Sequence, residues 1–196
     1  MVELQHRATP NPALTDYLAA HPALGAADFD SRDFQPVKQA VKADLNVDQG
    51  GLCAYCEIPL LATEGQLDHI KPKAGANARL DLCFVYGNFA QSCINPKTCG
   101  QKKKNGLLPI EPGHGCNAEW SLSTDGAIEP LPGLTRQRRH AVIQTRDMLG
   151  LNKDSNLVDE RRRWLNSAIT VLQQVPADFP EFLRTAPFRH ILATAF

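Results

Sequence analysis

The sequence predicts an α+β protein that is mostly helical, with a small cysteine-rich centre between helical ends. Helical periodicity of apolar residues is strongest over residues 34–49 and again after residue 134. Five of the six cysteines lie within residues 53–105, where the apolar segments are short and separated by turns. These observations predict three parts: an N-terminal arm and helix over 1–50, a core over 51–110 and a C-terminal helical region over 111–196.

The N-terminal part combines an irregular arm with one amphipathic helix. Residues 1–33 are rich in Pro, Ala and Asp and show weak periodicity, which predicts an irregular or partly helical segment. From Phe34 onward, apolar side chains recur at helical spacing as far as Leu45, and Gly50 and Gly51 mark the end of the helix. This helix leads directly into the first cysteine pair.

The core and the C-terminal region contain different kinds of element. In the core, residues 58–61 and 67–70 are typical of short strands, with loops at 75–77 and 86–88. Beyond the core, residues 121–126 are typical of a strand that turns at an Asp-Gly pair. The remaining predicted elements are helices over 135–149 and 155–174, the second ended by Pro176 and Pro180, and a short C-terminal helix.

The composition indicates a globular protein rather than a disordered or membrane-spanning one. The 196 residues are 43% hydrophobic and 21% charged, which is sufficient for an ordinary core. No stretch approaches the roughly 18 apolar residues that a transmembrane helix requires, and no secretory signal is visible. We therefore expect a cytoplasmic protein that does not bind membranes.

The net charge is zero, but the charges are unevenly distributed along the chain. Residues 69–104 carry seven basic side chains and one acidic one, and residues 134–196 carry ten basic and six acidic ones. Basic segments of this kind bind polyanions locally even in a neutral protein. The alternative is that these lysines and arginines only solvate exposed faces.

Four cysteines have a spacing that suits a structural metal site. Cys53 and Cys56 form a C-x-x-C pair, and Cys93 and Cys99 form a looser second pair. Disulfides are rare in a reducing cytoplasm, where close cysteine pairs more often bind metal. We therefore predict Zn²⁺ in a closed tetrahedral shell of four thiolates, with buried free thiols as the alternative. Cys83 or Cys116 is the alternative to a member of the second pair as a zinc ligand.

The segment between the two cysteine pairs concentrates groups that suit catalysis. Asp68 is followed directly by His69 on a predicted short strand, and Lys71 and Lys73 flank them. A carboxylate suits Mg²⁺, and an imidazole takes up a proton near neutral pH. Adjacent side chains project to opposite faces of a regular strand, so these two share one site only where the backbone bends. A buried structural histidine is the alternative.

Four motifs follow one another in a set order through the core. The chain reads CAYCE at 53–57, LDHIKPK at 67–73, YGNFAQSC at 86–93 and CGQKKKN at 99–105. This order resembles the HNH endonucleases of the zinc-stapled ββα-metal type. The similarity to one subfamily extends to STDGAIEP at 123–130, MLGLN at 148–152, Leu157 and Arg161. That subfamily comprises the HNH proteins found with retrons and as the nuclease partner of an ATPase in the Septu anti-phage defence pair.

The resemblance implies a role for each matching residue. His69 would be the general base that activates water, Asp68 would hold the catalytic Mg²⁺ or Mn²⁺, and Asn88 would brace the His69 loop. The structural zinc would be held by Cys53, Cys56, Cys93 and Cys99. Phosphates would be met by Lys71, Lys73 and, where the helix of the finger opens, Lys102, Lys103 and Lys104.

The chain departs from the family pattern in one place. The family has a His or Asn just after the last zinc cysteine as a second metal ligand, where this chain has Gly100 and Gln101. Gln101 offers a neutral carbonyl oxygen, and Asn105 or His114 stays open as an alternative. Because Mg²⁺ needs few protein ligands, we expect the metal to be held mainly by Asp68, phosphate oxygens and water.

The resemblance implies a metal-dependent nuclease that cleaves DNA, with RNA as the other substrate, inside a bacterial anti-phage defence complex. The helical ends would then dock an ATPase partner. The alternative is a catalytically impaired, zinc-stapled module that binds nucleic acid or protein, although a pure binding finger does not need Asp68 and His69. A redox role of the C-x-x-C pair is disfavoured because nothing upstream resembles a thioredoxin-like frame.

Overall fold

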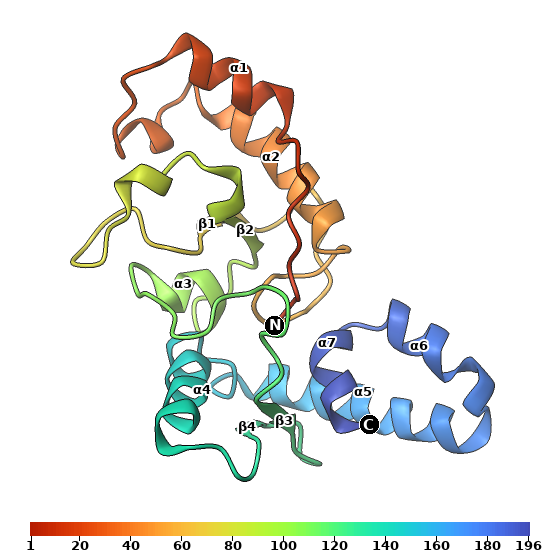
Figure 1. The fold of residues 1–196 in the computed structure, drawn as a ribbon. Helices are drawn as coiled ribbons and strands as arrows, with labels where there is room; N and C mark the ends of the chain where they lie inside the picture. Colours follow the sequence, from red (N-terminus) through yellow and green to blue (C-terminus); the bar gives the residue numbers. More distant parts are fainter.

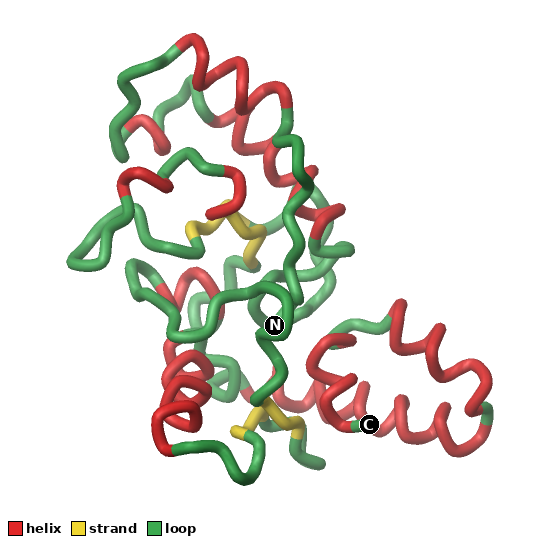
Figure 2. Tube along the Cα trace, in the orientation of Figure 1, coloured by secondary structure: helices red, strands yellow, loops and turns green.

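The structure, a computed structural model, describes residues 1–196 and contains seven α-helices and four short strands (Figure 1). The helices are α1 Pro12–Ala20, α2 Gln35–Asp48, α3 Cys99–Lys103, α4 Arg136–Met148, α5 Ser155–Gln174, α6 Phe179–Thr185 and α7 Arg189–Leu192. The strands are β1 Gln66–His69, β2 Phe89–Ser92, β3 Trp120–Leu122 and β4 Ile128–Pro130. They form two antiparallel pairs, β1 with β2 and β3 with β4 (Figure 2). The expected mixture of helix and strand, with helix predominating, is confirmed.

Three helices form where the apolar periodicity predicts them, at α2, α4 and α5. α4 begins after Thr135, whose side chain accepts a hydrogen bond from the amide of Arg138 at 3.3 Å. α5 begins after Asp154, whose carboxylate accepts one from the amide of Asn156 at 3.1 Å. None of the helices combines the length and the apolar character that a membrane span requires.

The strand predicted at 58–61 is wrong. This segment forms only an isolated bridge between Leu52 and Pro59. The amide of Leu60 donates to the carbonyl of Gly51 at 2.8 Å, but Pro59 has no N–H with which to extend a ladder. The chain therefore folds back over the C-x-x-C pair as an irregular turn.

The N-terminal helices pack on the β1–β2 pair. Phe34, Val41 and Leu45 are fully buried and share one apolar cluster with Phe89 of β2. α1 lies alongside α2 and adds Leu14 to the same cluster. In Figure 1 these two helices lie on one side of the strand pair and α3 lies on the other. The pair is therefore enclosed between the N-terminal helices and α3.

The rest of the chain packs into a second, larger apolar cluster. It joins Trp120 of β3, Val142 of α4 and Leu165 of α5 to the buried Cys53 and Cys99. The C-terminal elements thus pack against the cysteine-rich core instead of forming a separate body (Figure 1).

A buried arginine fixes the β3–β4 turn against α5. Arg161 is 1% exposed and donates from Nε to the carbonyl of Gly126 at 2.8 Å and from a terminal nitrogen to that of Leu151 at 2.9 Å. Gly126 has a φ of 88°, and a Cβ there would collide with the carbonyl of Val158 on α5. Arg161 therefore has a structural role and is withdrawn from any surface that binds nucleic acid.

Both ends of the chain meet at Glu57, next to the C-x-x-C pair. The Glu57 carboxylate pairs with the amino group of Met1 at 3.0 Å and accepts a hydrogen bond from the amide of His190 at 2.8 Å. The carbonyl of Glu57 also accepts one from the amide of Phe188 at 3.2 Å. These contacts hold the first residue and α7 against the cysteine-bearing turn.

Candidate active site and metal centre

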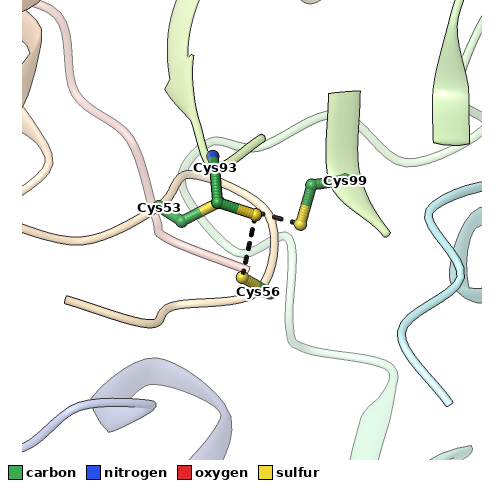
Figure 3. Close-up of side chains that lie close together, drawn as sticks. All are labelled: Cys53, Cys56, Cys93 and Cys99. Atoms are coloured by element: carbon green, nitrogen blue, oxygen red, sulfur yellow. Dashed lines mark hydrogen bonds between the residues drawn. The ribbon is translucent and has the colours of Figure 1, made fainter. Parts of the chain in front are cut away.

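Four cysteine side chains converge on one point of the core (Figure 3). The sulfurs of Cys53, Cys56, Cys93 and Cys99 all lie within 4.8 Å of one another. The Sγ–Sγ distance is 3.7 Å for Cys53 and Cys99 and 3.9 Å for Cys56 and Cys93. Zn–S bonds of about 2.3 Å in a tetrahedron place the sulfurs about 3.8 Å apart. The four buried thiols therefore fit a tetrahedral metal ion such as zinc.

Three separate parts of the backbone bring these sulfurs together. The C-x-x-C pair lies on the turn after α2, Cys93 follows β2, and Cys99 begins α3. The amide of Cys99 donates to the carbonyl of Leu149 at 2.8 Å, which fixes the start of α3 to the end of α4. Asn95 lies in the loop between Cys93 and Cys99, and its side-chain Nδ2 donates a hydrogen bond to the Asp154 carboxylate at 2.6 Å. The C-terminal region thus supports the loop that carries the second pair.

The remaining two cysteines lie elsewhere. Cys83 packs in the apolar cluster around α2, and the sulfur of Cys116 lies 3.7 Å from the carbonyl oxygen of Met1. Neither joins the four-sulfur group. The substitution that the spacing alone left open is therefore absent from the structure.

A cavity of about 310 Å³ opens between β1 and α3. Asp68 and His69 both line it, together with Gln66 on β1 and Gly100 and Gln101 on α3. β1 ends at His69, so the backbone leaves the regular strand at the point where the two adjacent side chains would otherwise diverge. The cavity brings together the carboxylate and the imidazole that the sequence singles out.

The Asp68 carboxylate is held through one of its two oxygens. Oδ2 accepts a hydrogen bond from the Tyr55 hydroxyl at 2.5 Å and pairs with the ammonium of Lys103 at 3.2 Å. Burial raises the pKa of Asp68 above its ordinary value, and the positive charge of Lys103 acts in the opposite direction. The other oxygen, Oδ1, lies beside Gly100. Oδ1 is therefore the oxygen left to meet a ligand.

The imidazole of His69 is buried, oriented and neutral. Its Nε2 lies 2.9 Å from the carbonyl oxygen of Cys83, and because a carbonyl only accepts, Nε2 carries the proton. The lone pair then resides on Nδ1. Burial lowers the pKa of His69 to about 4, so the ring is uncharged at neutral pH. An uncharged imidazole with a free lone pair is the form that a general base requires.

Asn88 joins the two loops that flank His69. Its Oδ1 accepts a hydrogen bond from the amide of Lys71 at 2.8 Å. Its Nδ2 donates to the carbonyl of Lys71 at 3.0 Å and to that of Leu82 at 3.1 Å. Asn88 is buried and outside the lining of the cavity, so these contacts join the two segments from below the surface of the protein.

The comparison with known proteins decides the family. No family model matches the chain. A protein of Vibrio cholerae serotype O1 biovar El Tor, provisionally named the HNH endonuclease of retron Vc95, is 40% identical over 201 residues, which covers 98% of each chain. The chain belongs to the HNH endonucleases. It is therefore an enzyme of phosphodiester hydrolysis, and the cavity with Asp68 and His69 is its candidate active site.

Most of the lysines expected at the phosphates of an HNH substrate are accessible. Lys102 and Lys104 are exposed at the end of α3, and Lys104 lines the cavity with Lys73. Lys73 is engaged by Asp30 at 2.5 Å, and Lys71 lies 3.7 Å from Glu111. The run of three lysines ends α3 instead of opening it, a position where positive charge favours the helix dipole.

Lys103 does not lie on the surface as expected. It is 4% exposed, and its Nζ donates to the carbonyl of His69 at 2.7 Å besides pairing with Asp68. One helical turn separates Cys99 from Lys103, so burying the cysteine also points Lys103 inward. Its ammonium balances the buried Asp68 charge of the HNH site, and the expectation of a phosphate contact is corrected.

Gln101 and Gly100 occupy the segment where the HNH pattern has a second metal ligand. Gln101 is exposed, lines the cavity, and donates from Nε2 to Oε1 of Gln66 at 2.5 Å. The other two candidates differ in position. Asn105 lines the same cavity, whereas His114 is fully exposed and lies 3.6 Å from Glu3.

Four residues of the HNH site escape the sequence reasoning. Phe29 and Asp30 reach the cavity from the N-terminal arm, with the Phe29 ring 4.4 Å from that of His69. Tyr55 lies within the C-x-x-C pair, and Gln66 lies two residues before Asp68 on the same face of β1. The period of two in a strand signals Gln66, whereas nothing local in the sequence signals the contact of the arm.

Proposed function

We propose that the protein is a metal-dependent endonuclease of DNA, and that β1, β2 and α3 form a ββα-metal finger. The observation that carries this proposal is the shared cavity of Asp68 and His69, with Nε2 of His69 tied to the carbonyl of Cys83. With Nε2 engaged by that carbonyl, Nδ1 is the ring nitrogen left free to accept a proton, on a residue that lines the cavity. A structural histidine needs no such free lone pair.

In the proposed reaction, His69 removes a proton from the attacking water at Nδ1. Asp68 would hold Mg²⁺ or Mn²⁺, and the bound ion would neutralise charge on the phosphate and on the oxygen that leaves when the P–O bond breaks. Tyr55 and Lys103 fix the carboxylate at Oδ2 and leave Oδ1 free. A positioned base contributes on the order of 10²–10⁴-fold to the rate. Asn88 keeps the His69 loop in place.

The four-sulfur group is proposed to bind zinc in a structural role. Four thiolates complete a tetrahedral shell and leave no open position for water. The cysteines connect the turn after α2, the end of β2 and the start of α3. A zinc ion there would hold α3 against β1 and so maintain the cavity that lies between them.

The regions outside the finger are proposed to serve a partner. The relative carries the name of a retron nuclease, which supports a place for this chain in a bacterial anti-phage complex with an ATPase subunit, in the cytoplasm. The proposed boundaries are an arm and helix over 1–50, the finger with its zinc knuckles over 51–110 and a docking region over 111–196. Exposed apolar side chains on the last region, Leu172 and Val175, support a docked partner there.

One observation favours the alternative of an impaired binding module. Gly100 offers no side chain beside Asp68, and the ammonium of Lys103 already balances the Asp68 charge. In that case the protein would retain zinc and bind nucleic acid without cleaving it. The free Oδ1 of Asp68 and the oriented His69 favour the enzyme.

The test is a cleavage assay on supercoiled plasmid, linear duplex DNA and RNA of matched sequence. Each substrate is incubated with the protein in Mg²⁺, Mn²⁺ or a chelator, with and without the proposed ATPase partner. We expect strand breaks in DNA that require the divalent ion. If zinc-loaded protein breaks no substrate under any of these conditions, the proposed nuclease activity is wrong and the binding module replaces it.

A further inference from the structure

The cavity contains a second oxygen-bearing side chain next to the free oxygen of Asp68. Gln66 and Asp68 are two residues apart on β1, so both side chains lie on the same face of the strand. Both line the cavity that faces α3. Oδ2 of Asp68 is taken by Tyr55 and Lys103, and Oδ1 is the oxygen that lies beside Gly100 of α3.

The absence of a side chain at Gly100 makes room for Gln66. A Cβ at position 100 would lie 2.6 Å from Nε2 of Gln66, 3.0 Å from Cγ of Asp68 and 3.1 Å from Oδ1 of Asp68. Any larger residue would therefore displace both side chains. The amide of Gln66 occupies the space beside Asp68 that a side chain from α3 would otherwise fill.

Gln101 of α3 orients the side-chain amide of Gln66 through a hydrogen bond. Its Nε2 donates to Oε1 of Gln66 at 2.5 Å. An amide carries an acceptor at one end and donors at the other, so a half-turn of both amides preserves the hydrogen bond between them. After that turn Oε1 of Gln66 lies where Nε2 lies now, beside Gly100, which Oδ1 of Asp68 also borders. The pair of glutamines therefore presents an oxygen to the site without losing its own contact.

We propose that the side-chain oxygen of Gln66 is the second protein ligand of the catalytic divalent ion, with Gln101 as its positioning residue. Neutral amide oxygens are ordinary ligands of hard divalent cations, which take oxygen from carboxylates, amides and water. The inference rests on the proposed metal-dependent function. It adds a protein ligand from β1 to Asp68, where the sequence left Gln101, Asn105 and His114 open as the second ligand.

The test measures Mn²⁺ affinity directly, by electron paramagnetic resonance on the full-length, zinc-loaded protein without nucleic acid. The variants are Gln66→Leu, Gln66→Glu, Asp68→Asn and, as a matched control, Gln39→Leu. Gln39 is an exposed glutamine of α2 outside the cavity. Zinc content and the thermal unfolding midpoint report whether each variant is folded.

Gln66→Leu should weaken Mn²⁺ binding about tenfold, which corresponds to about 1.4 kcal/mol. Gln66→Glu should tighten it, since a carboxylate replaces a neutral oxygen at the same position, and Gln39→Leu should leave it unchanged. The opposite charge effect of the Glu variant keeps the proposal testable if the Leu variant unfolds.

Two outcomes separate this inference from the proposed function. If Asp68→Asn abolishes Mn²⁺ binding while both Gln66 variants bind like the wild type, Gln66 is not a ligand and the nuclease proposal stands. If Asp68→Asn itself binds Mn²⁺ with unchanged affinity, the metal site at Asp68 is wrong and the role of Gln66 falls with it.

Discussion

The ammonium of Lys103 lies 3.2 Å from Oδ2 of Asp68, and the Lys103 side chain has no exposure to solvent. The pair joins α3 to β1 at Asp68, which lines the cavity of the HNH site. A buried charge pair of this kind becomes costly when one partner is removed, because the other charge stays buried without compensation. The position of this lysine therefore affects both the stability of the protein and the protonation state of Asp68.

Lys103→Met should lower the free energy of unfolding by about 3–5 kcal/mol. Lys102→Met, a neighbouring exposed lysine, should change it by less than about 0.5 kcal/mol and should weaken nucleic-acid binding instead. Denaturant unfolding and a binding titration on the two variants give the comparison. Equal effects of the two substitutions on stability would show that Lys103 is not buried.

Asn88→Ala should destabilise the protein by about 1–3 kcal/mol and slow cleavage further than the loss of stability explains. The reason is that Asn88 makes three hydrogen bonds to the backbone of Lys71, two residues after His69, and of Leu82, next to the Cys83 carbonyl that contacts His69. Asn77→Ala, in an exposed loop, is the control. Single-turnover rates measured well below the unfolding midpoint check this, and an unchanged rate in Asn88→Ala would remove the bracing role.

Cys99→Ser should reduce the zinc content and lower the thermal midpoint, because Cys99 links α3 to the four-sulfur group. Cys116→Ser should retain zinc, since its sulfur lies beside the carbonyl oxygens of Met1 and Val2 and outside the four-sulfur group. Elemental analysis of both variants after gel filtration is the measurement. Full zinc occupancy in Cys99→Ser would contradict the assignment of this ligand.

The contact between Arg7 and Asp48 should make the docking of the N-terminal arm sensitive to acid. Burial by itself would raise the pKa of Asp48, but hydrogen bonds from Arg7 and Tyr86 outweigh it and hold the pKa below its ordinary value. A carboxyl group whose pKa is lowered by folding stabilises the protein at any pH above its pKa in the unfolded chain. This contribution is lost as the pH falls through the pKa in the folded protein.

Asp48→Asn should therefore be less stable than the wild type at pH 7, and the difference should shrink toward acid. Thermal unfolding from about pH 7 to about pH 3, across the ordinary carboxyl range, measures it. Asp16→Asn provides the control on the exposed face of α1. A stability difference that grows on acidification would contradict a lowered pKa of Asp48.

The long helices are predictable from sequence because periodicity is local, and the four cysteines because two close pairs suit one tetrahedral metal site. α2, α4 and α5 show the 3.6-residue period, and the termini of α4 and α5 carry capping residues. The strand expected at 58–61 fails because its apolar residues include Pro59, which lacks a donor. The spacing of apolar residues alone does not show that a single proline prevents the strand.

The inner contacts of the site depend on tertiary packing and are harder to predict. Three consecutive lysines look equivalent in the sequence, but the turn of α3 buries Lys103 and exposes the two beside it. The contact of Phe29 with His69 joins residues 40 positions apart through the arm, which shows little periodicity. The environment that lowers the pKa of His69 to about 4 is thus invisible until the chain is folded.

The most direct test of the account is the single-turnover rate of DNA cleavage in Mn²⁺ for wild type, His69→Ala and His114→Ala. His114 is fully exposed and not part of the cavity lining, so it controls for the loss of a histidine. We predict a loss of about 10²–10⁴-fold for His69→Ala, partial recovery with added imidazole, and unchanged zinc content in all three proteins. Cleavage by His69→Ala at the wild-type rate would contradict the assignment of His69 as the base.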